Sequence, residues 1–294
     1  MPESKPEPPP IDFRAWIEAA NTDQTKRSQR QVTAIILNAI ALVDSFRGSL
    51  VFKGGALLAI AHGSQRQTSD LDFSARADPE MFAATFIEEM NRGLDRSRAQ
   101  LGYTQWRCRV QGKLRLQPKN FSADNFPAVE ANIAYARVGS RDEGHLGAGT
   151  CTHVIEVEFS FREPILETEN LHLIASDSRI EVYSVNELLA EKFRAYLQQT
   201  VRNRQRRQDI YDIAFLIEKT GQGIDRAIVH KALLEKCSAR KVPVDQGKID
   251  DLDLIKRAKA EWHTMALEIG ELPPFEQCFA IARTFYLSLP WDGA

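Results

Sequence analysis

Two aspartates stand two positions apart in the segment SDLDF, as Asp70 and Asp72. Successive side chains of a β-strand point to opposite faces, so a strand here would place both carboxylates on one face, roughly 6.6 Å apart along the chain. Two like charges repel each other unless water, a basic side chain or a cation lies between them. Mg²⁺ binds one or two carboxylates and completes its shell with water and substrate phosphate. The pair is therefore a candidate metal site, although an isolated D-x-D motif is more often a solvated sheet face.

A second alternating segment, VIEVEFSF, offers a third carboxylate. In a strand, Glu156, Glu158 and Ser160 would share one face. If this strand neighbours the aspartate strand, about 4.8 Å away, one of its glutamates can join the pair. A D-x-D motif with one carboxylate from an adjacent strand suits two metal ions that act on a phosphoryl group. We favour Glu158 over Glu156, but the spacing alone does not separate them.

A glycine turn precedes the aspartates, where VFKGGALLAIA leads from an expected strand through Gly54 and Gly55 into an expected helix. Glycines let backbone N–H groups approach an anion, and a helix N-terminus adds the positive end of its dipole. A lone Gly-Gly pair before a helix is usually a plain tight turn. Its closeness to the D-x-D motif makes a phosphate-binding turn the more specific interpretation.

The patterns around these motifs predict an α+β protein. Helical periodicity covers residues 12–46 and 78–101, strand-like segments follow between about 103 and 161, and helices continue from about 184 to the end, with breaks near KTGQG and GELPPF. We predict a disordered tail over residues 1–11, a mixed-sheet core domain with helices over 12–180, and an all-helical domain over 181–294.

Composition sets further limits. The net charge of −2 indicates no global affinity for nucleic acid, so a basic site would have to come from local clustering. The four cysteines, at 108, 151, 237 and 278, show no paired spacing, which favours reduced thiols over disulfides or a zinc site. No apolar run approaches the roughly 18 residues of a membrane span. We expect a cytoplasmic protein with no membrane contact.

Two basic runs leave alternatives open. Lys192 lies in the segment LLAEKFRAYL, and four arginines (Arg202, Arg204, Arg206, Arg207) precede Asp209 and Asp212. The run is either a solvated face or a contact for phosphates, with Asp209 orienting Lys192 or an arginine. Five more cations occupy WRCRVQGKLRLQPK (Arg107, Arg109, Lys113, Arg115, Lys119), either as a surface for an RNA backbone or as a solvated face. Arg66 is either an ion-pair partner of the acidic cluster or a phosphate contact.

These residues resemble the polymerase-β-like nucleotidyltransferases and, more narrowly, the AbiEii/AbiGii-type toxins of bacterial toxin–antitoxin and phage-defence systems. That family reads approximately K-G-G-T…R-x-S-x-D-h-D-h, which Lys53, Gly54, Gly55, Arg66, Asp70 and Asp72 match. Its later motifs resemble VEFSFRE, LLAEKFRAYL and RNRQRRQDIYDIAFLI, so the likeness covers about residues 50 to 218. Ala56 stands where the family usually has a hydroxyl, and Gln208 is inserted between the arginines and Asp209.

The resemblance implies transfer of a nucleoside monophosphate from an NTP to an acceptor, with release of pyrophosphate. It implies two Mg²⁺ ions, or Mn²⁺, on Asp70, Asp72 and Glu158, catalytic roles for Lys192 and Asp209, and an NTP site (Lys53, Gly54, Gly55, Arg66, Lys192, Arg207). The expected acceptor is RNA, particularly a tRNA 3′ end, and the expected partner is a cognate antitoxin. Two alternatives stay open, namely transfer to a protein or small molecule and a catalytically weak NTP-binding module.

Overall fold

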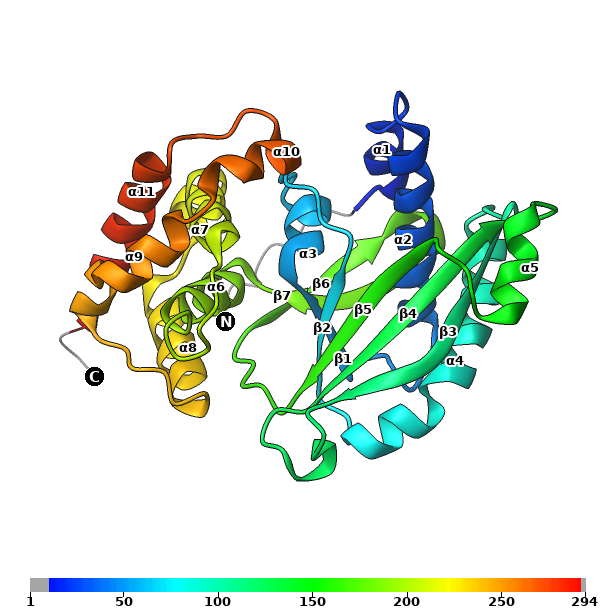
Figure 1. Cartoon of the computed structure of the whole chain (residues 1–294), viewed down its shortest axis with the longest axis horizontal. Coiled ribbons are helices and arrows are strands. Elements are labelled where there is room, and N and C mark those ends of the chain that lie inside the picture. The colour runs from blue at the N-terminus through cyan, green and yellow to red at the C-terminus, as the bar shows by residue number, and fades with distance from the viewer. Residues whose placement is uncertain (1–10, 292–294) are drawn as a thin grey trace, which may run out of the picture. The chain divides into compact units, whose positions relative to one another are not determined.

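The computed structural model describes residues 11–291, which divide into two compact units (Figure 1). Unit 1 consists of residues 11–56, 69–162 and 169–182, and unit 2 consists of residues 57–68, 163–168 and 183–291. Ten of the eleven residues of the predicted disordered tail lie outside the described residues. Ile11, the last of them, is buried, and its N–H donates to the carbonyl of His172 over 3.0 Å, so the tail prediction is wrong for this residue.

Unit 1 is built on a seven-stranded mixed sheet with the strand order β3-β4-β5-β2-β1-β7-β6. Strand β1 pairs antiparallel with β2, β2 pairs parallel with β5, and β4 is antiparallel to both β3 and β5. The strands are β1 (Leu50–Lys53), β2 (Leu71–Ala75), β3 (Trp106–Gln117), β4 (Ala128–Arg137), β5 (Val154–Phe161), β6 (Thr168–Leu173) and β7 (Ser178–Tyr183). The helices of unit 1 are α1 (Phe13–Glu18), α2 (Gln24–Leu42), α4 (Pro79–Gln100) and α5 (Arg141–Ala148).

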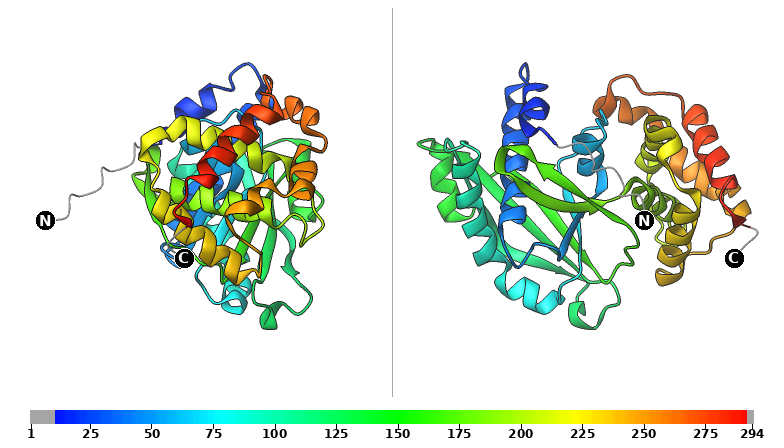
Figure 2. Two further views of the ribbon diagram at one scale, coloured as in Figure 1. Left: turned by 90° about the vertical axis from the view of Figure 1, so that its left-hand side faces the viewer. Right: turned by 180° about the vertical axis from the view of Figure 1, so that it is seen from behind.

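One face of the sheet carries the core. Phe52, Phe73 and Phe159 stand in register on β1, β2 and β5, with ring centroids 5.1 and 5.5 Å apart. Helix α4 places Phe82 and Phe86 on Phe159, each 4.9 Å away between ring centroids, and α2 and α4 pack against each other on this face (Figure 2). Because side chains alternate along a strand, the neighbouring residue in each of these strands points to the opposite face.

The start of α4 follows from its sequence. The Asp78 side chain accepts hydrogen bonds from the backbone N–H groups of Glu80 and Met81, and Pro79 occupies the first turn, where a missing N–H costs nothing. The predicted helix over 78–101 is confirmed. Helix α5, within the segment from which only strands were expected, was missed.

Unit 2 contains helices that pack beside one another (Figure 1). They are α6 (Val185–Leu197), α7 (Arg207–Thr220), α8 (Arg226–Ala239), α9 (Leu252–Lys259), α10 (Ala266–Ile269) and α11 (Phe275–Leu287). Helix α3 (Gly54–Ala61) begins in unit 1 and continues into unit 2 from Leu57. The predicted fold class, a mixed sheet with helices followed by a helical lobe, is confirmed, whereas the boundary near residue 180 stays a prediction. All four cysteines are free and buried.

Candidate active site

A row of five charged residues crosses the sheet of unit 1 on the face opposite the phenylalanines. The strand register pairs Lys53 with Asp72, Asp72 with Glu158, Glu158 with Glu130, and Glu130 with Arg115. Residues paired in register point to the same face of a sheet. We call these five residues the charged row. It places three carboxylates side by side between two cations, of which Lys53 is buried.

Gly54, the first residue of α3, lies directly against Asp72. A Cβ atom on Gly54 would stand 2.1 Å from Oδ2 of Asp72, and the backbone angle φ of Gly54 is +80°. Both facts require glycine here, since other residues rarely adopt this φ and any side chain would displace the carboxylate. The start of α3 is therefore held next to an aspartate of the charged row.

The register also separates the two candidate glutamates. Glu158 stands beside Asp72, whereas Glu156 stands opposite Asn132 and accepts a hydrogen bond from Arg115 over 2.7 Å. Asp70 comes one residue before β2 begins and is exposed, with its Oδ1 accepting from the Ser69 hydroxyl over 2.8 Å. The expectation that one strand holds both aspartates is therefore wrong for Asp70, because the ladder starts at Leu71.

The donor chemistry of this region suits Mg²⁺ or Mn²⁺. Asp72 and Glu158 lie in register on adjacent strands, and such strands are about 4.8 Å apart in a sheet. Only the backbone of Gly54, which has no side chain, fits against the Asp72 carboxylate. Within residues 11–291 no group of three or more His, Cys, Asp and Glu side chains lies close enough to hold a metal ion. Mg²⁺ does not require such a group, since one or two carboxylates with water and phosphate suffice.

A second polar cluster lies within unit 2, around two fully buried aspartates of α7. Asp212 accepts two hydrogen bonds from Arg66, over 3.0 Å from Nε and 3.1 Å from Nη2, and a third from Nζ of Lys192 over 2.6 Å. The two-pronged contact matches the planar guanidinium to the carboxylate. Arg66 thus pairs with a residue 146 positions away rather than with the acidic strand motif. Its predicted contact with NTP stays a prediction.

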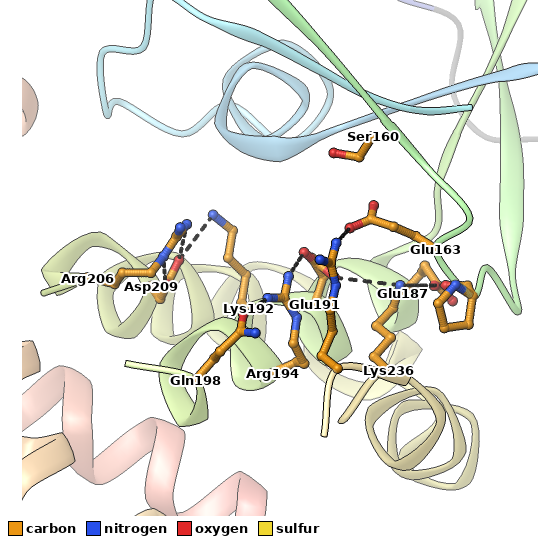
Figure 3. Close-up of polar contacts among 12 residues, drawn as sticks. Ser160, Glu163, Glu187, Glu191, Lys192, Arg194, Gln198, Arg206, Asp209 and Lys236 are labelled. Atoms are coloured by element: carbon orange, nitrogen blue, oxygen red, sulfur yellow. Dashed lines mark hydrogen bonds and ion pairs between the residues drawn. The ribbon is translucent and has the colours of Figure 1, made fainter. Parts of the chain in front are cut away.

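Asp209, one helical turn before Asp212, takes part in the same cluster. Its Oδ1 lies 3.5 Å from Nζ of Lys192, and its Oδ2 accepts from Nε of Arg206 over 2.6 Å (Figure 3). Lys192 therefore lies between two carboxylates, and Asp212 rather than Asp209 makes the shorter contact. Of the two arginines before Gln208, Arg206 holds Asp209. Arg207 lies 3.6 Å from Glu268 instead.

Electrostatics keep Asp212 and Arg66 ionised. Burial alone would raise the pKa of Asp212, but Lys192 and Arg66 outweigh it and hold the pKa of that carboxyl below its usual range. Conversely, burial acts to lower the pKa of Arg66, and the charge of Asp212 together with its hydrogen bonds raises it. The buried charges are thus matched, as buried charges must be for the fold to tolerate them.

The arginines of the basic strand β3 have carboxylate partners, whereas binding of an RNA backbone would need unpaired positive charge. Arg107 pairs with Glu143 over 2.9 Å, Arg109 with Asp95 over 2.8 Å, and Arg115 with both Glu130 and Glu156. Acidic neighbours therefore neutralise these three arginines.

Sequence reasoning missed Glu130. The alternation in AVEANIAYAR does place Glu130 and Asn132 opposite the buried Val129 and Ile133. That alternation predicts that the Glu130 carboxylate lies on a polar face of a strand. It does not predict which strands pair with that strand.

Replacement of Gly54 by alanine is expected to lower the nucleotidyl transfer that the sequence resemblance implies at least about 10²-fold, because the added Cβ displaces the Asp72 carboxylate and electrostatic groups of this kind are worth that much. The positive φ adds about 1–2 kcal/mol of instability. Gly102→Ala is the matched control, since Gly102 has φ +75° with nothing within 4 Å of an added Cβ. Urea unfolding should show a similar loss of stability from the positive φ in both variants. Label transfer should show a loss of activity in Gly54→Ala alone. Equal activities would refute the steric argument.

A mixed sheet that presents adjacent carboxylates beside a glycine turn at a helix start is the arrangement of a nucleotidyltransferase. The family described as "Nucleotidyl transferase AbiEii toxin, Type IV TA system" matches residues 35–281, and the chain belongs to this family of toxin nucleotidyltransferases. The predicted recognition and enzyme class are confirmed.

Solved structures support the fold. The chain is similar to the nucleotidyltransferase toxin MenT4 from Mycobacterium tuberculosis H37Rv, with a TM-score of 0.56 and 18% identity over 96% of this chain and 91% of that chain. It is also similar to JHP933 from Helicobacter pylori, with a TM-score of 0.55 and 12% identity over 90% of this chain and 91% of that chain. A comparison with curated proteins gives no match. In the part of the chain that the structure describes, no helix is both long and apolar enough to cross a membrane.

Proposed function

We propose that the protein transfers a nucleoside monophosphate from an NTP to an RNA acceptor, most specifically a tRNA 3′ end, in a divalent-metal-dependent reaction. The observation that carries the proposal is the contact between Gly54 and Asp72, with Glu158 in register beside Asp72. It brings a phosphate-binding type of turn next to a carboxylate pair. The toxin would thereby inactivate RNA, and a cognate antitoxin is the proposed partner.

In this proposal an acceptor hydroxyl oxygen forms a bond to the α-phosphorus of the NTP, and the bond from that phosphorus to the pyrophosphate oxygen breaks. Asp72 and Glu158 would hold the metal ions, with Asp70 as a third proposed ligand, and the ions would supply positive charge that neutralises the phosphates. Glu158 would also accept the hydroxyl proton. Backbone N–H groups at Gly54 and Gly55 contact the phosphates, where the N-terminus of α3 favours negative charge.

Four cationic side chains are further proposed NTP contacts. Lys53 is the buried cation of the charged row next to Asp72, and its positive charge offsets the carboxylates. Lys192 and Arg66 are proposed to contact the β- and γ-phosphates, with Asp209 and Asp212 orienting them. Arg207, 29% exposed at the side chain, is a further proposed phosphate contact.

Incubation of the purified protein with Mg²⁺, each of the four α-labelled NTPs and total tRNA tests the proposal. Label is expected in RNA, removable by ribonuclease but not by protease, and absent when EDTA is added. Label that protease removes would assign a protein acceptor instead. No transfer with any NTP, combined with calorimetric NTP binding, would leave only the catalytically weak binding module.

A further inference from the structure

Five arginines of unit 2 gather where α6, the loop after it and the residue following α8 come together. They are Arg194, Arg202, Arg204, Arg206 and Arg240, and Arg202 interacts electrostatically with each of the other four. We call them the arginine cluster. Arg202 and Arg204 are exposed, and the other three are partly exposed.

Three of these arginines have carboxylate partners. Arg194 pairs with Glu191 and Arg206 with Asp209, as Figure 3 shows. Arg240 pairs with Glu163 over 2.7 Å. For Arg202 and Arg204, by contrast, the described residues 11–291 provide no ion pair and no side-chain hydrogen bond. The arginine cluster therefore carries more positive charge than its paired carboxylates balance.

The loop that carries Arg202 and Arg204 is held in place. The buried Gln199 accepts a hydrogen bond from the backbone N–H of Arg206 through its side chain, over 2.9 Å, and from the N–H of Arg204 through its carbonyl, over 2.9 Å. Asn203 has φ +46°, and its side chain accepts from Arg257 over 2.9 Å. Two unbalanced guanidinium groups are thus presented on an ordered loop, which lowers the entropic cost of binding a ligand.

The excess positive charge of the arginine cluster favours binding of an anion. Burial and the neighbouring arginines lower the pKa of Arg202 from its ordinary value, so the charged guanidinium is destabilised where it stands. A bound anion would relieve this repulsion. Guanidinium groups bind phosphate oxygens in a two-pronged geometry, and the loop presents two such exposed groups, Arg202 and Arg204.

We infer that the arginine cluster binds backbone phosphates of the RNA acceptor, through Arg202 and Arg204 above all. The inference rests on the proposed function, which names RNA as the acceptor. The three arginines of β3 have acidic partners, whereas Arg202 and Arg204 have none among residues 11–291. With a net charge of −2, the protein needs such a local excess to hold a polyanion.

Fluorescence anisotropy with a 5′-labelled tRNA transcript tests the inference in the full chain. The double variant Arg202→Gln/Arg204→Gln is expected to bind about tenfold more weakly near 0.15 M salt, and its plot of log K against log salt should be shallower by about 1.4, as for two lost single-strand phosphate contacts. Arg202→Lys/Arg204→Lys should restore much of the slope. Arg47→Gln/Arg92→Gln, which removes two exposed arginines from unit 1, is the matched control and should change neither quantity.

Calorimetric NTP binding, measured on the same proteins, separates this inference from the proposed function. Weaker tRNA binding with unchanged NTP affinity supports the inference. Lost NTP affinity with unchanged tRNA binding would assign the arginines to the nucleotide triphosphate and overturn it. A wild-type protein that binds NTP but no tRNA would also overturn it, while leaving nucleotidyl transfer to another acceptor intact.

Discussion

Replacement of Asp72 by asparagine is expected to lower the rate of nucleotidyl transfer at least about 10³-fold, since loss of a proposed metal ligand would remove several kcal/mol of stabilisation from the transition state. Asp72 combines the two features on which the proposed site depends, its closeness to Gly54 and its register with Glu158. Asparagine keeps the size of the side chain and removes only its charge. Label transfer from an α-labelled NTP to tRNA measures the effect.

Strand β5, which pairs with the strand of Asp72, supplies a chemically matched control. Glu158→Gln and Glu156→Gln remove the same charge from the same strand, but only Glu158 stands in register with Asp72. We expect a loss of about 10²-fold or more for Glu158→Gln. For Glu156→Gln we expect near wild-type activity, because that side chain pairs with Arg115. Equal losses for the two glutamate variants would contradict the assignment, as would substantial activity in Asp72→Asn with an unchanged fold.

The contrast between these glutamates shows how far the sequence could carry the prediction. Alternation along VIEVEFSF placed both on one face, since it depends only on neighbours in the chain. The choice between them depends on the register of β5 against β2, two strands that are distant in sequence. Glu130 was missed for the same reason, because its place in the charged row comes from pairing of β4 with β5.

The partner of Arg66 lay beyond sequence reasoning as well. Its position four residues before Asp70 left open an ion pair with the acidic cluster or a phosphate contact, and the structure pairs Arg66 with Asp212 of α7. Asp209 and Asp212 stand about one helical turn apart in the sequence, and in the structure both lie near Nζ of Lys192. The spacing could not predict that Asp212 receives both Arg66 and Lys192, since that contact depends on how distant segments pack.

Asp212→Asn is accordingly expected to destabilise the protein by about 3–5 kcal/mol, the cost of breaking a buried ion pair and leaving its partners uncompensated. Arg66 and Lys192 would both lose their closest carboxylate in a buried setting. Urea unfolding measures the free energy. Asp253→Asn is the control, because it breaks an exposed pair with Arg257 and should cost at most about 0.5 kcal/mol. Similar values for the two variants would show that the buried cluster contributes no more than a surface pair.

The same variant should change how stability depends on pH. The pKa of Asp212 is lowered in the folded protein, below the value of about 3.9 that an aspartate has in an unfolded chain. As pH falls below about 5, the unfolded state therefore takes up this proton first, and the stability from Asp212 is lost as pH falls through the folded pKa. Asp95, Asp250 and Asp251, whose pKa values are also lowered, remain in both proteins. Between about pH 5 and 2, the unfolding free energy of Asp212→Asn should therefore fall less steeply than that of the wild type, and parallel curves would show that Asp212 is not the charged partner of Arg66 and Lys192.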